Sequence, residues 1–167
     1  MSTIPVIEAR SLSVSFPGAK PFFSRAPRPV IQAVKEVDLA VSAGETLALV
    51  GESGCGKSTL AKTVIKLHEP TGGSILLDGE DITQHGFARM RPIRSKMQMI
   101  FQDPYASLNP RQRVSEIVME PYLENAPGKV RDARDRALAL LAKVGLGPEH
   151  ADRYPHQFSG GQRQRIG

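Results

Sequence analysis

Apolar and polar residues alternate near the start of the chain in a pattern that predicts two strands. In the first segment, serines separate three apolar residues, Leu12, Val14 and Phe16. The second segment, Val37–Val41, repeats the alternation. A period of two places the apolar side chains of each segment on one face. The stretch between them, Pro17–Pro29, is basic and rich in proline, which predicts an exposed loop.

Three shorter segments predict further strands. Thr46–Val50 is a continuous apolar run that ends at a glycine, which is typical of a strand buried on both faces of a parallel sheet. Met97–Phe101 is predicted to be another short apolar strand. Ile75–Leu77 is followed by Asp78-Gly79, which predicts a hairpin.

Helical spacing follows the Thr46–Val50 run and dominates the last third of the chain. A helix that begins near Lys57 carries Leu60, Val64 and Leu67. A short helix is predicted over Val114–Met119, ending before Pro121. A longer helix is predicted to end at Gly145, and its apolar residues recur every three or four positions: Val130, Ala133, Ala137, Leu141 and Val144.

A glycine-rich segment joins the predicted strand Thr46–Val50 to the helix that follows. It matches G-x-x-x-x-G-K-[ST], and its residues are Gly51, Glu52, Ser53, Gly54, Cys55, Gly56, Lys57 and Ser58. Glycines permit backbone angles that let successive N–H groups converge on phosphate oxygens. The start of the helix adds a positive dipole end at the same point. The motif and its context predict a nucleotide-binding phosphate loop; the alternative is a glycine-rich turn that caps a helix.

Each polar side chain of this loop has an expected role. Lys57 reaches the β- and γ-phosphates, and the Ser58 hydroxyl ligates Mg²⁺. Thr59 is a further candidate phosphate contact. Cys55 occupies a variable position of the motif, so we interpret it as filler, with a redox role as the alternative.

Composition and charge narrow the picture only slightly. The chain has 167 residues, of which 40% are hydrophobic, which suits one globular domain. The formal charge is +5, but 22 basic residues are mixed with 17 acidic ones, so the balance does not indicate nucleic acid. The single cysteine excludes an intrachain disulfide. No apolar run approaches the roughly 18 residues that a membrane span needs.

Two further motifs resemble one family of nucleotide-binding proteins. Phe158–Arg165 resembles the signature of the ABC-transporter ATPases, with Phe158 where leucine is usual. Gln102 follows the predicted strand Met97–Phe101 and resembles the family's Q-loop glutamine. The phosphate loop, Gln102 and the signature occur in the family order. This resemblance implies that Gln102 is a catalytic residue and a Mg²⁺ ligand, and that Lys57 also acts in catalysis.

The signature predicts a second anion site. Ser159 can cap a helix, and Gln162 lies three residues later, where it completes a capping box. In the family, this site faces the γ-phosphate held by another subunit, so two chains enclose two ATP molecules. The residues implied to contact that nucleotide are Ser159, Gly160, Gly161 and Gln162. A helix cap without a ligand is the alternative for these residues.

A narrower resemblance lies at Gln102–Arg111, which is similar to the ATPases of dipeptide and oligopeptide importers, the peptide and nickel group. The Pro17–Pro29 insert resembles the same group. This implies transmembrane permease subunits, a second ABC ATPase subunit (the same or a different chain) and, indirectly, a substrate-binding protein as partners. It also implies a peripheral location at the cytoplasmic face of the inner membrane, with no nucleic-acid partner. The transported substrate is not encoded in this chain.

Phe16 has two competing interpretations. The resemblance implies an aromatic residue near this position that stacks on adenine, and Phe offers a π-face. Phe16 also continues the apolar face of Leu12 and Val14, which favours core packing. Phe22 and Phe23 are the other aromatic candidates.

The resemblance implies an α/β, P-loop NTPase fold of the ABC type, with an antiparallel β subdomain and a helical subdomain, incomplete at its C-terminus. The expected divisions are residues 1–103 for the β subdomain and phosphate-loop core, 104–158 for the helical subdomain, and 159–167 for the start of the signature helix. The expected function is the ATP-binding subunit of an importer of peptides or related solutes.

Two alternatives remain open at this point. One is a non-transport ABC ATPase in repair or translation, and the other is a nucleotide-binding fragment without turnover. In the family, the metal-associated aspartate and the water-polarising glutamate follow the signature, and this sequence stops at Gly167. We therefore expect the 167-residue polypeptide, a fragment or truncated product by this interpretation, to lack ATPase activity and to fold poorly alone.

Overall fold

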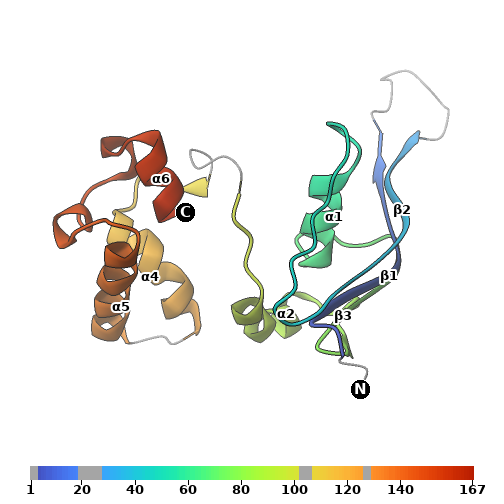
Figure 1. Cartoon of the computed structure of the whole chain (residues 1–167), viewed down its shortest axis with the longest axis horizontal. Helices are drawn as coiled ribbons and strands as arrows, with labels where there is room; N and C mark the ends of the chain where they lie inside the picture. Colours follow the sequence, from blue (N-terminus) through green and yellow to red (C-terminus); the bar gives the residue numbers. More distant parts are fainter. Residues whose placement is uncertain (1–3, 19–27, 102–106, 126–128) are drawn as a thin grey trace. The chain divides into compact units, whose positions relative to one another are not determined.

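The computed structural model describes residues 4–18, 28–101, 107–125 and 129–167. It divides into two compact units, Met1–Met97 and Gln98–Gly167. Figure 1 shows the strands in the first unit and helices α4 to α6 in the second. In the part of the chain described, no helix combines the length and apolar character needed to cross a bilayer.

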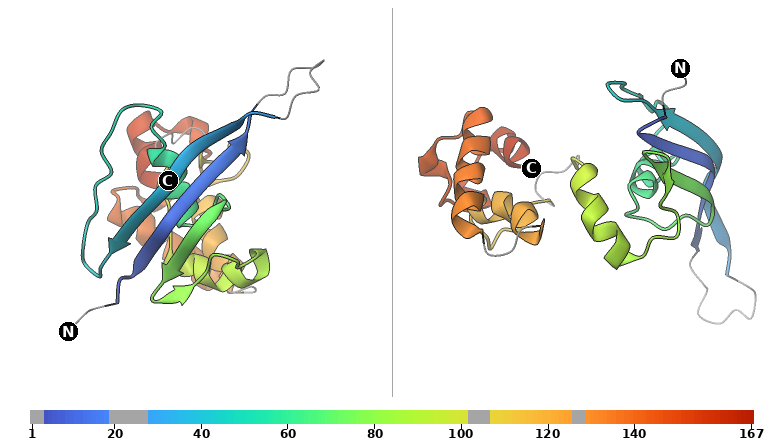
Figure 2. Two further views of the ribbon diagram at one scale, coloured as in Figure 1. Left: turned by 90° about the vertical axis from the view of Figure 1, so that its right-hand side faces the viewer. Right: turned by 90° about the horizontal axis from the view of Figure 1, so that it is seen from below.

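A four-stranded antiparallel sheet, ordered β2-β1-β3-β4, organises the first unit. Its strands are β1 (Ile7–Pro17), β2 (Val30–Val41), β3 (Gly72–Leu77) and β4 (Glu80–Asp81). Figure 2 shows β1, β2 and β3 side by side in one twisted layer. The two alternating strands and the hairpin predicted from the sequence are confirmed. Asp78 and Gly79 have φ of 50° and 82°, the left-handed values that a tight hairpin turn requires.

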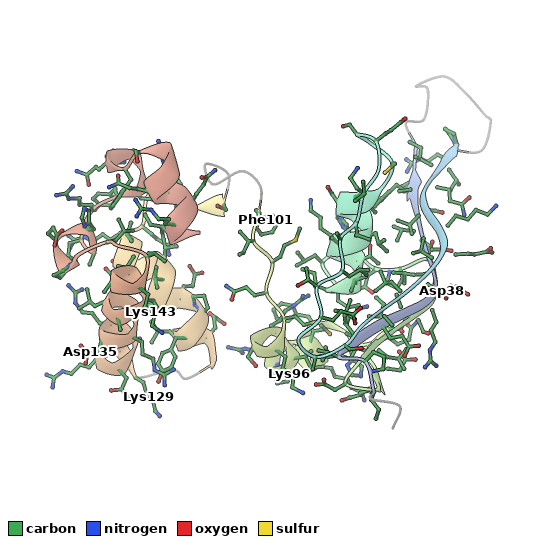
Figure 3. The ribbon with its side chains drawn as sticks, viewed as in Figure 1. Asp38, Lys96, Phe101, Lys129, Asp135 and Lys143 are labelled. Atoms are coloured by element: carbon green, nitrogen blue, oxygen red, sulfur yellow. The ribbon has the colours of Figure 1, made fainter. Side chains whose placement is uncertain are left out.

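The ladder between β1 and β2 is interrupted where side chains replace backbone partners. Ser11 and Glu36 have positive φ, 47° and 45°, and the register shifts nearby. The Ser11 amide donates to Asp38 Oδ1 at 2.7 Å, and the Glu36 amide donates to Ser13 Oγ at 2.9 Å. Figure 3 labels Asp38 on β2. Side-chain acceptors therefore satisfy the amides that the irregular ladder leaves unpaired.

Helix α1 (Lys57–Val64) packs against one face of this sheet. Leu12 and Val14, predicted to point inward, are almost completely buried, and Leu60 and Val64 of α1 belong to the same buried core. Leu67, predicted on the same helical face, lies beyond the end of α1 and is exposed. Helix α2 (Phe87–Ile93) and the short 3-10 helix η1 (Arg94–Lys96) follow β4.

Two predicted strands are wrong. Thr46–Val50 and Met97–Phe101 pair with none of the strands in the described residues. Val50 is 93% exposed and Ile100 81% exposed, so neither segment is buried on two faces. Phe101, labelled in Figure 3, is also exposed. An apolar run becomes a strand only when another segment supplies hydrogen-bond partners, and no described segment does so here.

The described part of the second unit contains helices α4 (Val114–Asn125), α5 (Val130–Lys143) and α6 (Gly160–Ile166), with short 3-10 helices at Pro148–His150 and Pro155–Gln157. The predicted helix over residues 130–144 is confirmed, and Gly145 ends it with φ of 75°. The predicted end of α4 before Pro121 is wrong. Tyr122 and Leu123 pack against buried Ala133 and Ala137 of α5, so apolar contacts on both sides of the proline keep the segment helical.

Candidate functional site

Gly56 gives the glycine-rich segment its shape. Its φ of 96° is left-handed, and it immediately precedes α1 as the N-cap residue. A Cβ at this position would lie 2.3 Å from the carbonyl oxygen of Ala33 on β2, so no side chain fits. Gly54 also has a left-handed φ, 83°, but a Cβ there would meet nothing within 4 Å. The loop therefore approaches the β2 backbone at Gly56 and is open at Gly54.

The Lys57 ammonium folds back across the same loop. It donates to the carbonyl oxygens of Gly51 at 2.7 Å and Glu52 at 2.6 Å. The sulfur of Cys55, an exposed free thiol, lies 3.5 Å from the same ammonium. The positive charge of Lys57 therefore lies against the loop that the sequence predicts to bind phosphate.

The first turn of α1 contains no acidic residue, and the N-cap residue makes no side-chain hydrogen bond to it. The Ser58 hydroxyl is exposed in that turn, and Thr59 is half-buried beside it. An uncapped helix start, with its N–H groups and dipole, suits an anion.

The described residues near this loop offer few ligands for a Mg²⁺ ion. Across the residues that the structure describes, no group of three or more His, Cys, Asp or Glu side chains could hold a metal ion. Ser58 supplies one hydroxyl oxygen at an exposed position. Mg²⁺ commonly takes most of its ligands from substrate phosphates and water, so a single protein oxygen is compatible with that mode of binding.

The signature residues form helix α6 with the predicted cap. The Gln162 amide donates to Ser159 Oγ at 3.3 Å, and the Ser159 amide donates to Gln162 Oε1 at 3.0 Å. Phe158, just before the cap, is buried in the second unit among Val114, Leu141 and neighbouring apolar residues. The capping box predicted from the sequence is confirmed, and the buried Phe158 anchors the chain where α6 begins.

The segment that enters the signature is tied to the start of α4. The Val114 amide donates to the Arg153 carbonyl at 2.9 Å, and the Ser115 amide donates to the Ala151 carbonyl at 2.8 Å. The Tyr154 side chain hydrogen-bonds Arg113 and is the main cause of a raised pKa for that guanidinium. These contacts fix the path of the chain just before α6.

Arg165 holds α6 against the end of α5, and sequence reasoning missed it. Its Nη1 donates to the Val144 carbonyl oxygen at 2.8 Å. Val144 is the C-cap of α5, where carbonyl groups lack helical partners. No signal in the sequence locates this contact, because it depends on how two helices that are distant along the chain pack together.

The remaining predicted site residues are only partly placed. Phe16 is half-buried against the core of the first unit, and its ring meets His68 edge-on at 5.7 Å. Core packing is therefore present, and the stacking role stays a prediction. Gln102, Phe22 and Phe23 lie outside the described residues.

Comparisons with known proteins give the site its context. The family model described as ABC transporter matches residues 34–167. The chain is 46% identical over 162 residues to the dipeptide transport ATP-binding protein DppF of Escherichia coli, covering 97% of the chain and 48% of that protein. It is also 46% identical to the oligopeptide transport ATP-binding protein AppF of Bacillus subtilis, covering 97% of the chain and 49% of that protein. The chain thus spans about half the length of these curated relatives.

Solved structures agree with the sequence matches. The ATP-binding cassette MJ0796, in a dimeric post-hydrolysis state bound to ADP and Pi, superposes with a TM-score of 0.80 at 27% identity, covering 96% of this chain and 66% of that one. The cassette cbiO1 of Clostridium perfringens superposes with a TM-score of 0.72 at 24% identity, covering 97% of this chain and 59% of that one. The α/β fold predicted for an ABC ATPase is confirmed, and the chain belongs to the ABC transporter family.

Proposed function

We propose that this chain binds ATP through Gly51–Ser58 and Thr59. The observation that carries the proposal is the structure at the start of α1. The β2 backbone leaves no room for a side chain at position 56, and the first turn of the helix has neither an acidic residue nor a side-chain cap. The Lys57 ammonium lies against the carbonyl groups of the same loop. Lys57 pairs with the β- and γ-phosphates, and the Ser58 hydroxyl is one ligand of the accompanying Mg²⁺. Gln102 completes the metal and water contacts, as the family resemblance implies.

We propose further that Ser159–Gln162 contacts ATP held by a second ATPase subunit. A Cβ at Gly161 would meet none of the described residues within 4 Å, and its φ is not left-handed, so neither packing nor backbone conformation in the described part of the chain requires glycine there. Close approach of the second subunit's nucleotide would explain why glycine occupies position 161. The neighbour MJ0796 is described as a dimer, which supports this arrangement.

The proposed cellular role is ATP-driven import of peptides or related solutes. The support is similarity to proteins named for dipeptide transport, oligopeptide transport and glutathione import. None of these names supports a non-transport ATPase, the first alternative. The implied partners are permease subunits at the cytoplasmic face of the membrane, with a substrate-binding protein acting through them.

Calorimetric titration of the full chain with MgATP tests the binding step. Lys57→Ala is expected to weaken binding by about two orders of magnitude, since it removes the charge-assisted contact to phosphate. Lys62→Ala, in the last turn of the same helix, is the matched control and retains wild-type affinity. Equal affinity of wild type and Lys57→Ala would overturn the assignment.

The metal role is tested separately. Ser58→Ala is expected to weaken binding of MgATP more than binding of ATP in excess chelator, because only the metal-bound form uses the hydroxyl. An equal loss under both conditions would remove Ser58 from the metal site and leave the phosphate loop intact. Transport is tested by co-purification with a polytopic membrane protein, and association with nucleic acid or ribosomes instead would favour the non-transport alternative.

A further inference from the structure

Helix α1 has an unusual C-terminal end. The Leu67 amide donates to the Lys62 carbonyl at 2.8 Å, and the Lys66 amide donates to the Thr63 carbonyl at 2.8 Å. This pair of bonds is the helix-ending motif in which glycine normally takes the left-handed position. Here Lys66 takes it, with φ of 57°. A side chain in a backbone conformation that favours glycine requires contacts that hold it there.

The Lys66 side chain makes such contacts. It is 1% exposed, and its ammonium donates to the carbonyl oxygen of Thr83 at 2.6 Å and pairs with the Glu69 carboxylate. Thr83 is itself fixed, because its hydroxyl oxygen accepts from the Ile75 amide of β3 at 2.8 Å. Lys66 therefore ties the end of α1 to the β3–β4 hairpin.

A second cation closes the same helix end from another element. The Arg94 guanidinium, on η1, donates to the carbonyl oxygen of Ile65 and, at 2.7 Å, to that of Lys66. These carbonyls lie where a helix leaves acceptors unpaired, and positive charge is favourable there. Two buried or partly buried cations thus hold one helix end against two separate elements of the first unit.

We propose that Lys66 and Arg94 are positioning residues of the nucleotide site. Helix α1 has eight residues, a rigid rod about 12 Å long, and its opposite end carries Lys57, Ser58 and the loop amides. Holding the C-terminal end of α1 against η1 and the hairpin therefore also holds the hydrogen-bond donors at its N-terminal end in place. The inference deepens the proposed ATP site and rests on it, although the placement of the loop can be measured without nucleotide.

The test compares variants of the full chain with wild type. Arg94→Met removes the guanidinium, and Lys66→Gly removes the ammonium while supplying the residue that the left-handed backbone favours. Lys96→Met is the matched control. Lys96, labelled in Figure 3, is an exposed η1 cation that pairs with Asp78 at 3.1 Å instead of with α1. The readouts are amide chemical shifts of Gly54, Gly56 and Lys57 without nucleotide, the MgATP dissociation constant, and folded content by circular dichroism.

We expect Arg94→Met and Lys66→Gly to shift the loop amides and to weaken MgATP binding about three- to tenfold, with Arg94→Lys intermediate because a lysine reaches only one of the two carbonyls. Lys96→Met should match wild type in both readouts. If Arg94→Met fails to fold, Lys66→Gly and Arg94→Lys decide. Folded variants with wild-type amide shifts and wild-type affinity would overturn the inference. A wild-type chain that binds no ATP would instead overturn the proposed function, and the amide shifts would still decide whether the rear contacts place the loop.

Discussion

The starts of helices α1 and α6 are built in opposite ways. At α1 the N-cap is Gly56 in a left-handed conformation, and no side chain accepts from the first-turn amides. At α6 the N-cap is Ser159, which exchanges two hydrogen bonds with Gln162. A capped helix start has used part of its hydrogen-bonding capacity, whereas an uncapped one retains it for a ligand. Of these two helices, α1 offers a ligand the fuller set of first-turn donors, and α6 offers the amides of Gly160 and Gly161.

The open start of α1 does not result from a shortage of acceptors nearby. In the same unit, carboxylates accept loop and strand amides at three places: Asp38 from Ser11, Glu45 from Ser42 and Asp81 from Thr83. Helix α2 of the same unit also begins at a glycine without a side-chain cap, Gly86, but its backbone there is extended, whereas Gly56 is left-handed. At α1 the uncapped start also follows a glycine-rich segment directly, which is the arrangement expected of a binding loop.

The largest expected effect comes from adding a side chain at Gly56, the uncapped start of α1. Gly56→Ala combines a left-handed φ with a clash against the Ala33 carbonyl, so we expect a loss of about 2–5 kcal/mol in the free energy of unfolding. Gly54→Ala shares the strained φ without the clash, and we expect about 1–2 kcal/mol. Urea unfolding of both variants checks this, and equal losses would mean that the approach to β2 is unimportant.

A smaller effect is expected from removing the side-chain cap at the start of α6. Ser159→Ala removes the acceptor of the Gln162 amide, so we expect about 1 kcal/mol of destabilisation in the second unit. Ser159→Asp should retain most of the stability, because a carboxylate also caps. Amide hydrogen exchange over α6 measures the change locally, and unchanged exchange in Ser159→Ala would show that the cap contributes nothing.

Gly161→Ala separates stability from recognition at the same helix. A Cβ there meets nothing, so we expect stability to be unchanged or raised by up to about 1 kcal/mol. If the proposed contact with a second subunit is correct, ATP-dependent dimerisation should nevertheless weaken in this variant. Sedimentation with and without MgATP, in an otherwise complete cassette, makes the comparison. Dimerisation at the wild-type level would place the partner's nucleotide elsewhere.

The smallest expected effect concerns Asp81, one of the carboxylates that accept a backbone amide in the first unit. Asp81 accepts from the Thr83 hydroxyl and amide, and these hydrogen bonds, the hydroxyl first, hold its pKa below the usual value. A lowered pKa in the folded state stabilises the fold above the unfolded-state pKa, and this contribution is lost as the pH falls through the folded-state pKa.

Thr83→Val should raise the Asp81 pKa towards 3.8 while the amide bond keeps it somewhat lowered. The Ile75 amide loses an acceptor in the same variant, so total stability is a poor readout. A carboxyl-carbon NMR titration of Asp81 is the direct measurement. An unchanged pKa would show that the hydroxyl is not its main cause.

Features that depend on a few neighbouring residues could be predicted from the sequence. The Asp78-Gly79 turn, the Ser159–Gln162 cap and the alternation through Leu12 and Val14 each follow from local backbone or spacing rules. The glycine-rich motif at Gly51–Ser58 is also recognisable from the sequence, and its role in binding phosphate stays a prediction. The sequence did not show that Gly56 is forced by the Ala33 carbonyl, since that contact joins segments more than twenty residues apart.

Features that depend on distant partners could not be predicted in the same way. Thr46–Val50 has strand composition, but composition supplies no neighbour to pair with. Pro121 indicated a helix end, but packing of Tyr122 and Leu123 on α5 outweighed the local preference. Lys66 and Arg94 carry no motif at all, and only the folded chain brings them to the end of α1.

If the proposed ATP site is correct, the bonds from Lys57 to Gly51 and Glu52 make nucleotide binding an exchange reaction. Before any anion arrives, the ammonium already has two carbonyl acceptors, so it is neither bare nor fully hydrated. An incoming phosphate replaces these acceptors as well as water, and only the difference between the two sets of bonds contributes to affinity. The heat released should therefore be modest for so charged a ligand. A loop that is held by its own lysine has less conformational freedom to lose, which reduces the entropy lost on binding.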